Sequence, residues 1–429
     1  MSWIGLDDTD SPEGGCTTWD MHILLTHLEE NGFRLVGAPR LVRLWPHAPR
    51  RTRGNAALSA EIVPVELGKM DDRTDEHHAA NQNEVSQESN LHTILEQWFT
   101  QRFQHLSQIT HPDDGTTPSP TLVWSREKLP ADWYWSAVRE WVEPASRLTA
   151  LEELEGTQVW SVGRIDGVVG ASSAIAWPAD RDWTWEATAW RMAENIGADR
   201  KVPSESVAEM AELFSGTILN RDPNAGRSLI APRTPCPVLY GIRAEDEQSA
   251  DSAHDWLQNQ DSVEKCVAKR THKSNQATGD HLVSSNSGVT ISPVTDRKGG
   301  HASVEVFDGK CHLVLVAFSE GGEVNKLLRN SQPGDRLSWR GTVAPDGSIH
   351  LENLRMDDAV PRIENRPKCE CGSRFRRKGR GQPLTCAACS NESHSFWLGS
   401  RIPGEGTWVE PPISQRRHLA MPLNREPKV

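Results

Sequence analysis

Three aspartates stand close together near the start of the chain, directly after its first apolar stretch. The segment GLDDTDSPEGGCTTW, residues 5–19, places Asp7, Asp8 and Asp10 between that stretch and a helical pattern. Carboxylates at the carboxyl end of a strand are typical ligands of a Mg²⁺ ion that carries nucleotide phosphates. The sequence therefore predicts a Mg²⁺–nucleotide site, with an acidic surface turn as the alternative; the spacing does not fit an EF-hand calcium loop.

Glycines and hydroxyl residues complete the same segment. Gly14 and Gly15 would let backbone N–H groups approach phosphates where a helix begins. Thr17 and Thr18 stand in the first turn of that helix, as caps, metal ligands or phosphoryl acceptors. A Walker A pattern is absent, which excludes an ordinary P-loop.

A cationic cluster lies in the segment RLWPHAPRRTRGN, residues 43–55. Beside a Mg²⁺–phosphate site it would neutralise charge that develops on a transferred phosphoryl group, or hold RNA phosphates. The alternative is an arginine-rich surface without such a role. The cluster comprises Arg43, Arg50, Arg51, Arg53 and Asn55.

Four cysteines near the C-terminus have the spacing of a zinc site. Cys369 and Cys371 are separated by about fifteen residues from Cys386 and Cys389. Two such pairs predict a tetrahedral four-thiolate Zn²⁺ centre, which would hold together a hairpin too small to fold alone. The first pair is one residue shorter than the usual C-x-x-C, so a reduced, metal-free turn is the alternative.

The turn between the two cysteine pairs is strongly basic. Five cations in seven residues suit contacts with a nucleic-acid backbone, whereas the simpler reading is a solvated run of charge. Residues 361–429 carry 13 Lys and Arg against six Glu, although the whole chain carries −12. The five cations are Arg374, Arg376, Arg377, Lys378 and Arg380.

The elements that must position these residues follow from the hydrophobic pattern. Residues 2–6, 41–44 and 57–65 predict strands, and residues 19–31 predict a helix. Residues 68–90 are polar and aperiodic, which predicts a mobile insertion. An amphipathic helix follows, and then Trp-rich helices to about residue 155.

Further units follow along the chain. Strands and helices alternate from about residue 160, as in a small α+β sandwich, and residues 272–281 read as a linker. Short alternating strands over 283–358 predict a five-stranded barrel of the oligonucleotide-binding type. We therefore expect domains at 1–150, 151–275, 283–358 and 361–400, and a basic tail at 401–429.

Composition limits the cellular setting. The 429 residues are enough for several domains, and the mean hydropathy is −0.58. No long apolar run is present, so the sequence predicts a cytoplasmic protein without a membrane span, a secretory signal or a disulfide framework.

Taken together, these motifs resemble the archaeal isoleucine-tRNA 2-agmatinylcytidine synthetase family over nearly the whole chain. Seven blocks in the same order make a chance match very unlikely. They are GLDDTDSPEGGCTTW (5–19), RLVRLWPHAPRRTRGNAALS (40–59), GVVGASSAIAW with WEATAWR (167–191), GRSLIAPRTPCPVLYGIR (226–243), GGHASVEV (299–306), PKCECGSRFRRKGRGQ (367–382) and RRHLAMPL (416–423).

The resemblance implies a multidomain α/β and α+β protein with a kinase-like N-terminal domain, a ferredoxin-like domain, an OB-fold barrel and a zinc ribbon. It implies an ATP-dependent ligase that phosphorylates the carbon-2 oxygen of the wobble cytidine in a CAU anticodon and replaces it with agmatine. Phosphorylation turns a poor leaving group into one that an amine displaces.

The resemblance also implies roles for individual residues. Thr17 would become phosphorylated, and the aspartates, Gly14, Gly15, Arg43, Arg53 and Asn55 would bind Mg²⁺–ATP. An acidic residue would hold the agmatine guanidinium; the candidates are Asp166, Glu186 and Asp222, each of which is otherwise a surface acid. The zinc ribbon and the C-terminal segment would grip the acceptor stem of the tRNA, through the five cations named above with Arg416, Arg417 and His418.

Two other function classes stay open. A barrel with a zinc ribbon is also typical of non-catalytic nucleic-acid-binding proteins, but that reading leaves the N-terminal half unexplained. A kinase or ligase for a free small molecule would use the same aspartates, but it gives the basic C-terminus no role.

Overall fold

The computed structural model describes residues 1–10, 15–49, 54–65, 76–108, 117–282, 285–362, 368–393 and 405–425; at 76–87 and 107–108 it describes the backbone. The chain divides into two compact units, residues 1–283 with 413–429, and residues 284–412. In the described part of the chain, no helix is both long and apolar enough to cross a membrane.

An eight-stranded sheet organises the first unit, in the order β5-β4-β1-β3-β2-β10-β6-β9. Neighbouring strands are antiparallel, except that β10 runs parallel to β2. The two N-terminal domains that we expected as separate bodies therefore share one sheet. The strands are β1 (Ser2–Asp7), β2 (Phe33–Arg43), β3 (Ala56–Pro64), β4 (Thr121–Ser125), β5 (Thr157–Ser161), β6 (Thr184–Arg191), β9 (Val238–Ala244) and β10 (Cys266–Ser274).

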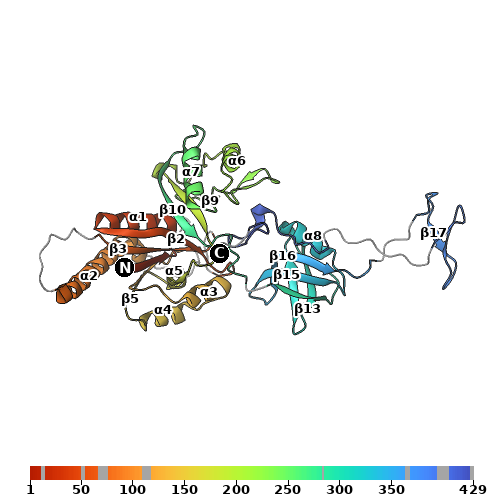
Figure 1. Cartoon of the computed structure of the whole chain (residues 1–429), viewed down its shortest axis with the longest axis horizontal. Coiled ribbons are helices and arrows are strands. Elements are labelled where there is room, and N and C mark those ends of the chain that lie inside the picture. Colours follow the sequence, from red (N-terminus) through yellow and green to blue (C-terminus); the bar gives the residue numbers. More distant parts are fainter. Residues whose placement is uncertain are drawn as a thin grey trace. The chain divides into compact units, whose positions relative to one another are not determined.

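Helices cover both faces of the sheet (Figure 1). Side chains alternate along β1, so Ile4 and Leu6 face one side and Trp3 the other. The first side packs against α1 (Thr17–Glu30) and α2 (Glu76–Phe103). The second side packs against α3 (Ala131–Arg139), α4 (Pro144–Glu152) and α5 (Gly167–Ala176).

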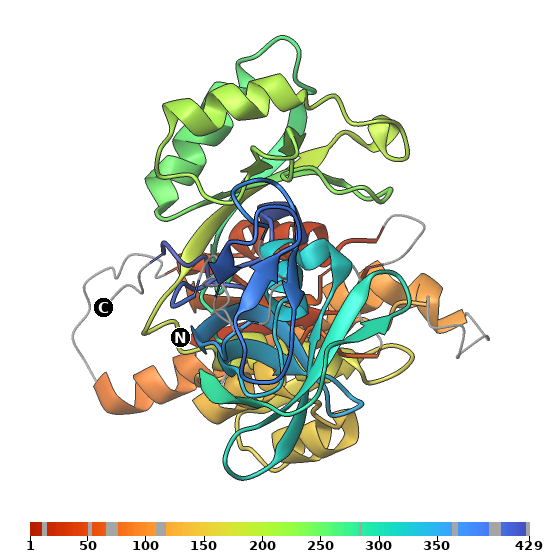
Figure 2. The same cartoon turned by 90° about the vertical axis from the view of Figure 1, so that its right-hand side faces the viewer.

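The far end of the sheet has its own apolar core. Helices α6 (Ser204–Leu213) and α7 (Glu247–Gln258) lie side by side over it in both views (Figures 1 and 2). Asp246 caps α7 by accepting a hydrogen bond from the backbone N–H of Ser249 at 2.8 Å. A short hairpin, β7 (Arg221–Asp222) with β8 (Arg227–Ser228), projects nearby.

Two sequence predictions were wrong in this unit. Residues 272–281 are not a linker: Asn275, Gln276 and Ala277 are at most 1% exposed. Their polar side chains have buried hydrogen-bond partners, so composition alone made them resemble a surface segment. Residues 76–90, expected in a mobile insertion, belong to α2, because an amphipathic helix anchored at 91–103 extends readily by further helical turns.

The C-terminal segment returns to the first unit instead of forming a separate tail. The carbonyl oxygens of His418 and Leu419 accept hydrogen bonds from Ala277 and Gly279, both at 2.8 Å. Leu419 is buried in the core beneath α3 and α5. The barrel and the cysteine-rich region are thus inserted between two parts of one folded unit.

Arg425 anchors the C-terminal segment to the rest of the first unit. Its guanidinium donates to both oxygens of Asp182, to Glu245 at 2.9 Å and to two carbonyl oxygens. The Arg425 side chain is 5% exposed, so Arg425→Met would leave Asp182 buried without its counter-ion.

We expect Arg425→Met to lower the free energy of unfolding by about 3–5 kcal/mol, measured by urea titration. The control is Arg126→Met, since Arg126 pairs with Glu88 at the surface; its loss should cost under about 1 kcal/mol. Equal losses in the two variants would contradict a buried fastening role.

The second unit contains a small closed barrel, which confirms the expected five strands. Strands β11, β15, β16, β14 and β13 form a ring that closes through the β11–β13 pairing, and β12 adds to β13. The elements are β11 (Asn286–Thr290), β12 (Thr295–Arg297), β13 (His301–Phe307), β14 (His312–Ala317), α8 (Glu323–Arg329), β15 (Arg336–Val343) and β16 (Ile349–Asp358). Three short strands, β17 (Phe375–Arg377), β18 (Leu384–Cys386) and β19 (Glu392–Ser393), form a separate sheet.

Candidate active site

The first two aspartates lie where β1 ends. The Asp8 backbone has a φ of 56°, in the left-handed region that aspartate tolerates better than most residues. Its N–H donates to Asp7 Oδ1 at 2.7 Å, and its carbonyl oxygen accepts from Ser119 at 3.0 Å. This turn directs the Asp7 carboxylate towards the start of α5, where Gly170 leaves no room for a Cβ beside Asp7 Oδ2.

The negative charges of Asp7 and Asp8 are buried and only partly balanced by positive charges. Burial, with repulsion from Asp8, raises the pKa of Asp7 well above its usual range. Burial raises the pKa of Asp8 to about 7. The positive charge of Arg164 opposes this shift, but repulsion from Asp166 and Asp10 supports it. Such a cluster favours a bound cation.

Asp7, Asp8 and Asp166 line a cavity of about 70 Å³ with Trp45 and Trp141. Asn55 also lines it and donates to the Trp45 carbonyl oxygen at 2.8 Å, so it fixes the loop that carries this indole. A cleft of about 540 Å³ is lined by Trp141, Arg164 and Asp166 among others. The cavity therefore combines carboxylates with aromatic walls.

Asp10 has a different position from its two neighbours. Its Oδ1 accepts from the Thr17 backbone N–H at 3.0 Å and so caps the start of α1. Below it, Thr9 donates to Asp20 at 2.5 Å, and Arg102 donates to Asp20 at 2.6 and 2.8 Å. These contacts fix the first turn of α1.

The two threonines of that turn differ in their partners. Thr18 Oγ1 accepts from the Trp190 indole N–H at 3.1 Å. The Thr17 hydroxyl lies 3.4 Å from Thr9 Oγ1, and Thr17 is only 4% exposed. Both line a second cavity, of about 420 Å³, at the end of the sheet.

This second cavity is rich in cations. Strand β2 contributes Arg43, strand β9 contributes Arg243, and the segment between β8 and β9 contributes Arg233. Arg227 and His418 also line it, as do the acids Asp10 and Glu186. The arginines outnumber the acids, so the cavity suits an anionic group.

Glu186 is bound by these cations. Burial would raise the pKa of Glu186, but the positive charges of Arg43 and Arg243 hold it below its usual range. One oxygen lies 4.0 Å from Arg43 Nη2 and accepts a short hydrogen bond from Gln276. Thr188 donates to the other oxygen at 3.3 Å, so the carboxylate has little capacity left for the guanidinium of a ligand.

Arg43 is fixed through its backbone. Its N–H donates to Asn275 Oδ1 at 2.7 Å, and its carbonyl oxygen accepts from Asn275 Nδ2 at 2.9 Å. Its buried Nε has no hydrogen-bond partner among the described residues. The Arg43 Nε–H is therefore available to donate a hydrogen bond to a ligand in the cavity.

The structure separates the remaining predicted residues. Asp222 is the last residue of β7, where its carboxylate accepts hydrogen bonds from the backbone N–H groups of Asn224, Ala225 and Ser414. It therefore holds the C-terminal segment and is not among the residues that line the cavity. Gly15 precedes α1. Gly14 and Arg53 lie outside the described residues.

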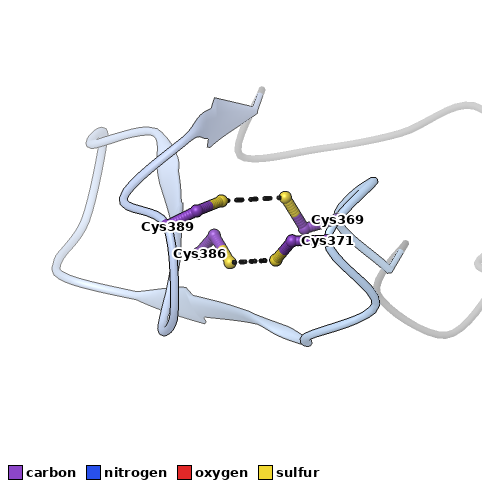
Figure 3. Close-up of side chains that lie close together, drawn as sticks. All are labelled: Cys369, Cys371, Cys386 and Cys389. Carbon is purple, nitrogen blue, oxygen red and sulfur yellow. Dashed lines mark hydrogen bonds between the residues drawn. The ribbon is translucent and has the colours of Figure 1, made fainter.

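The four cysteines converge as the sequence predicts (Figure 3). Their sulfur atoms all lie within 4.8 Å of one another; the pairs Cys369–Cys389 and Cys371–Cys386 are each 3.4 Å apart. Sulfurs bound to one tetrahedral Zn²⁺ are about 3.8 Å apart, so the set fits this ion. Backbone N–H groups of Cys389 and Ala388 lower the pKa of Cys386, whereas the neighbouring thiols raise the pKa of Cys389 against a backbone hydrogen bond from Asn391, as expected for thiols this close together.

The basic residues of the turn between the cysteine pairs are accessible. All five cations from Arg374 to Arg380 are at least partly exposed, in and around β17. Arg416 and Arg417 are half-buried in the first unit. His418 lines the cavity that contains Thr17, and its expected contact with the tRNA acceptor stem stays a prediction.

Sequence reasoning missed several residues of this site. Arg243 and Arg233 were within a quoted motif but received no role, and Asn275 and Gln276 were in the supposed linker. The sequence signal that could have indicated these four residues was the presence of polar side chains within or next to stretches of high β-propensity.

Comparison with known proteins gives a consistent result. Family models described as the TiaS TCKD domain and the TiaS FLD domain match residues 3–163 and 166–281. The isoleucine-tRNA 2-agmatinylcytidine synthetase TiaS of Methanopyrus kandleri is 29% identical over 454 residues, covering 98% of this chain and 96% of that protein. The TiaS of Acidilobus saccharovorans is 31% identical over 402 residues, covering 88% and 84%.

Solved structures agree. Apo TiaS aligns with a TM-score of 0.80 at 25% identity, and a complex of TiaS with its isoleucine tRNA and ATP aligns with a TM-score of 0.78 at 26% identity. Each alignment covers 99% of this chain and 97% of the other.

Proposed function

Since this chain belongs to the TiaS family of isoleucine-tRNA 2-agmatinylcytidine synthetases, we propose that it uses ATP to join agmatine to the wobble cytidine of the isoleucine tRNA with a CAU anticodon. The enzyme is a ligase that forms a carbon–nitrogen bond. The carbon-2 oxygen of the base leaves as phosphate, and the agmatine nitrogen takes its place.

The observation that carries this proposal is the pairing of two cavities at the end of β1. Carboxylates line one, and the Thr17 hydroxyl with several arginines lines the other. Asp7 and Asp8 suit Mg²⁺ held by one or two carboxylates and by the substrate phosphates, which would neutralise charge on the nucleotide. Arg43 and Arg243 suit the phosphoryl group that Thr17 accepts.

The finer assignments belong to the same proposal. The first unit would combine a kinase-like domain with a ferredoxin-like domain, and the second an OB-fold with a zinc ribbon held by Zn²⁺. The exposed cations of the ribbon would contact tRNA phosphates. The protein would act in the cytoplasm, where tRNA, ATP and agmatine occur together.

A direct test is mass spectrometry of nucleosides from an unmodified transcript of the CAU-anticodon isoleucine tRNA, incubated with the protein, ATP, Mg²⁺ and agmatine. We expect a cytidine heavier by agmatine less water, and no such product with Asp8→Asn. An unmodified transcript despite intact tRNA binding would support the non-catalytic reading. ATP turnover that ignores tRNA would support a small-molecule enzyme.

The agmatine pocket allows a graded prediction. Asp166 lines the carboxylate cavity, where it accepts a hydrogen bond from Arg164 at 2.7 Å and is about one-fifth exposed. Glu186 is more deeply buried, and Asp222 accepts three backbone N–H groups. We expect Asp166→Asn to raise the agmatine KM about 10-fold, since one charged hydrogen bond is lost. Asp222→Asn should leave that KM within about twofold; equal KM values for Asp166→Asn and the wild type would remove Asp166 from the pocket.

A further inference from the structure

His418 reaches the Thr17 cavity from the last described segment of the chain. Its carbonyl oxygen accepts a hydrogen bond from the Ala277 N–H, and the residue lines the cavity, where it is exposed. The position that a Cβ on Gly54 would occupy is 3.0 Å from His418 Nε2 and 2.9 Å from Arg43 Nη1. The imidazole and the guanidinium are therefore neighbours.

The charged groups around this imidazole keep it neutral. The positive charge of Arg43 on β2 lowers the pKa of His418 well below its usual range, and the charge of Arg243 on β9 lowers it further. Glu186 on β6 and Asp10 are the acids of the same cavity, but Glu186 lies 4.0 Å from Arg43 and accepts from Gln276, and Asp10 accepts the Thr17 backbone N–H. Neutral imidazole has a lone pair that accepts a proton.

Other groups that line the cavity are less suitable as bases. The sulfur of Cys236 accepts a hydrogen bond from Arg200 at 3.2 Å, and the Thr18 hydroxyl oxygen accepts from Trp190. Among the described residues that line this cavity, His418 is the one imidazole.

We propose that His418 is the proton acceptor for the agmatine amine, an inference that rests on the proposed function. The neutral amine attacks carbon 2 of the phosphorylated cytidine, and a carbon–nitrogen bond forms. The bond from carbon 2 to oxygen breaks, and the oxygen leaves with the electron pair as phosphate. The proton lost by the nitrogen passes to the ring of His418.

The arrangement links this proton transfer to the phosphate. While the phosphate lies beside Arg43 and Arg243, its negative charge offsets theirs, so the imidazolium is stabilised in that state only. When the phosphate departs, the arginines repel the imidazolium and the proton returns to water. His418 is thus reset after each turnover.

The test compares His418→Gln with His27→Gln, a histidine in the last turn of α1 that does not line the cavity. Phosphate transfer from labelled ATP to Thr17 and single-turnover agmatidine formation are measured on the same samples. For His418→Gln we expect phosphate transfer within about threefold of wild type and agmatidine formation slower by about 100-fold or more. Added imidazole should restore part of the rate.

The dependence on pH gives an independent readout. Titration of the agmatine amine affects wild type and variant alike, so it cancels in the ratio of their rates. Because Arg43 lowers the pKa of His418 well below its usual range, that ratio should stay constant through neutral and alkaline pH and fall only at acidic pH, where His418 becomes protonated.

Three results would overturn the proposal. If His418→Gln forms agmatidine within threefold of the wild-type rate, His418 is not the proton acceptor, but the proposed synthetase function stands. If phosphate transfer to Thr17 and agmatidine formation are slowed equally, and imidazole restores neither, His418 has only a structural role in the cavity. If the wild type phosphorylates Thr17 but forms no agmatidine, the proposed function itself fails, and the role of His418 falls with it.

Discussion

Thr17→Ala is expected to abolish phosphate incorporation from ATP and to slow agmatidine formation by about 10³-fold or more. A covalent acceptor has no substitute once its hydroxyl is removed, and effects of this size are usual for nucleophiles. Thr18→Ala should keep phosphate incorporation within about tenfold, because its hydroxyl oxygen already accepts the Trp190 indole N–H.

The measurement uses γ-labelled ATP, with the phosphopeptide located by mass spectrometry. Thr26→Ala is the matched control, since Thr26 lies on the same helix and donates to the His22 carbonyl oxygen away from the cavity. Phosphate on Thr18 in the wild type, with Thr17→Ala fully active, would exchange the roles of the two residues.

Removal of zinc is expected to unfold the ribbon while the first unit keeps its fold. Among the described residues of this region, the buried cluster comprises Phe375, Leu384, Cys369 and Cys386, too few apolar contacts to hold three short strands. A structural zinc ion contributes about 10–16 kcal/mol in small domains, so nothing else in the described ribbon replaces it.

We expect one zinc per chain in the wild type by elemental analysis, and none in Cys386→Ser. This variant should lose tRNA affinity by about tenfold or more at moderate salt, with a shallower salt dependence, because the exposed cations of the turn lose their rigid support. Cys311→Ser, at an exposed cysteine outside the cluster, is the control. Unchanged zinc content in Cys386→Ser would contradict the four-cysteine site.

The parts of the fold that follow from local sequence were predictable. The strand before Asp7, the helix after Cys16 and the converging cysteines each depend on neighbours within a few residues or on a single hairpin. The buried segment around Asn275 was not predictable, because its partners Arg43 and Tyr134 are 232 and 141 residues away in the chain. In the sequence, a buried polar segment whose partners are distant in the chain has the same composition as a surface loop.

The same limit applied to the site. The aspartates and threonines lie in one motif, so their chemistry could be inferred from spacing. Arg243 reaches the cavity through the pairing of β9 with β6, and His418 through a segment that follows the whole second unit. Both depend on tertiary structure that no local pattern records, and this is why an acid such as Glu186 resembled a ligand for agmatine before its arginine partners were known.

The return of the C-terminal segment also has a consequence for synthesis on the ribosome. Residues 284–412 are translated between the main body of the first unit and the segment that carries His418, Leu419 and Arg425. At usual elongation rates this takes on the order of 10 s, during which the cavity lacks one wall and Asp182 lacks its counter-ion. A chain whose translation stops within the barrel or the ribbon would therefore carry every aspartate and threonine of the motif and still be unable to complete the cavity, so that only fully translated chains become competent.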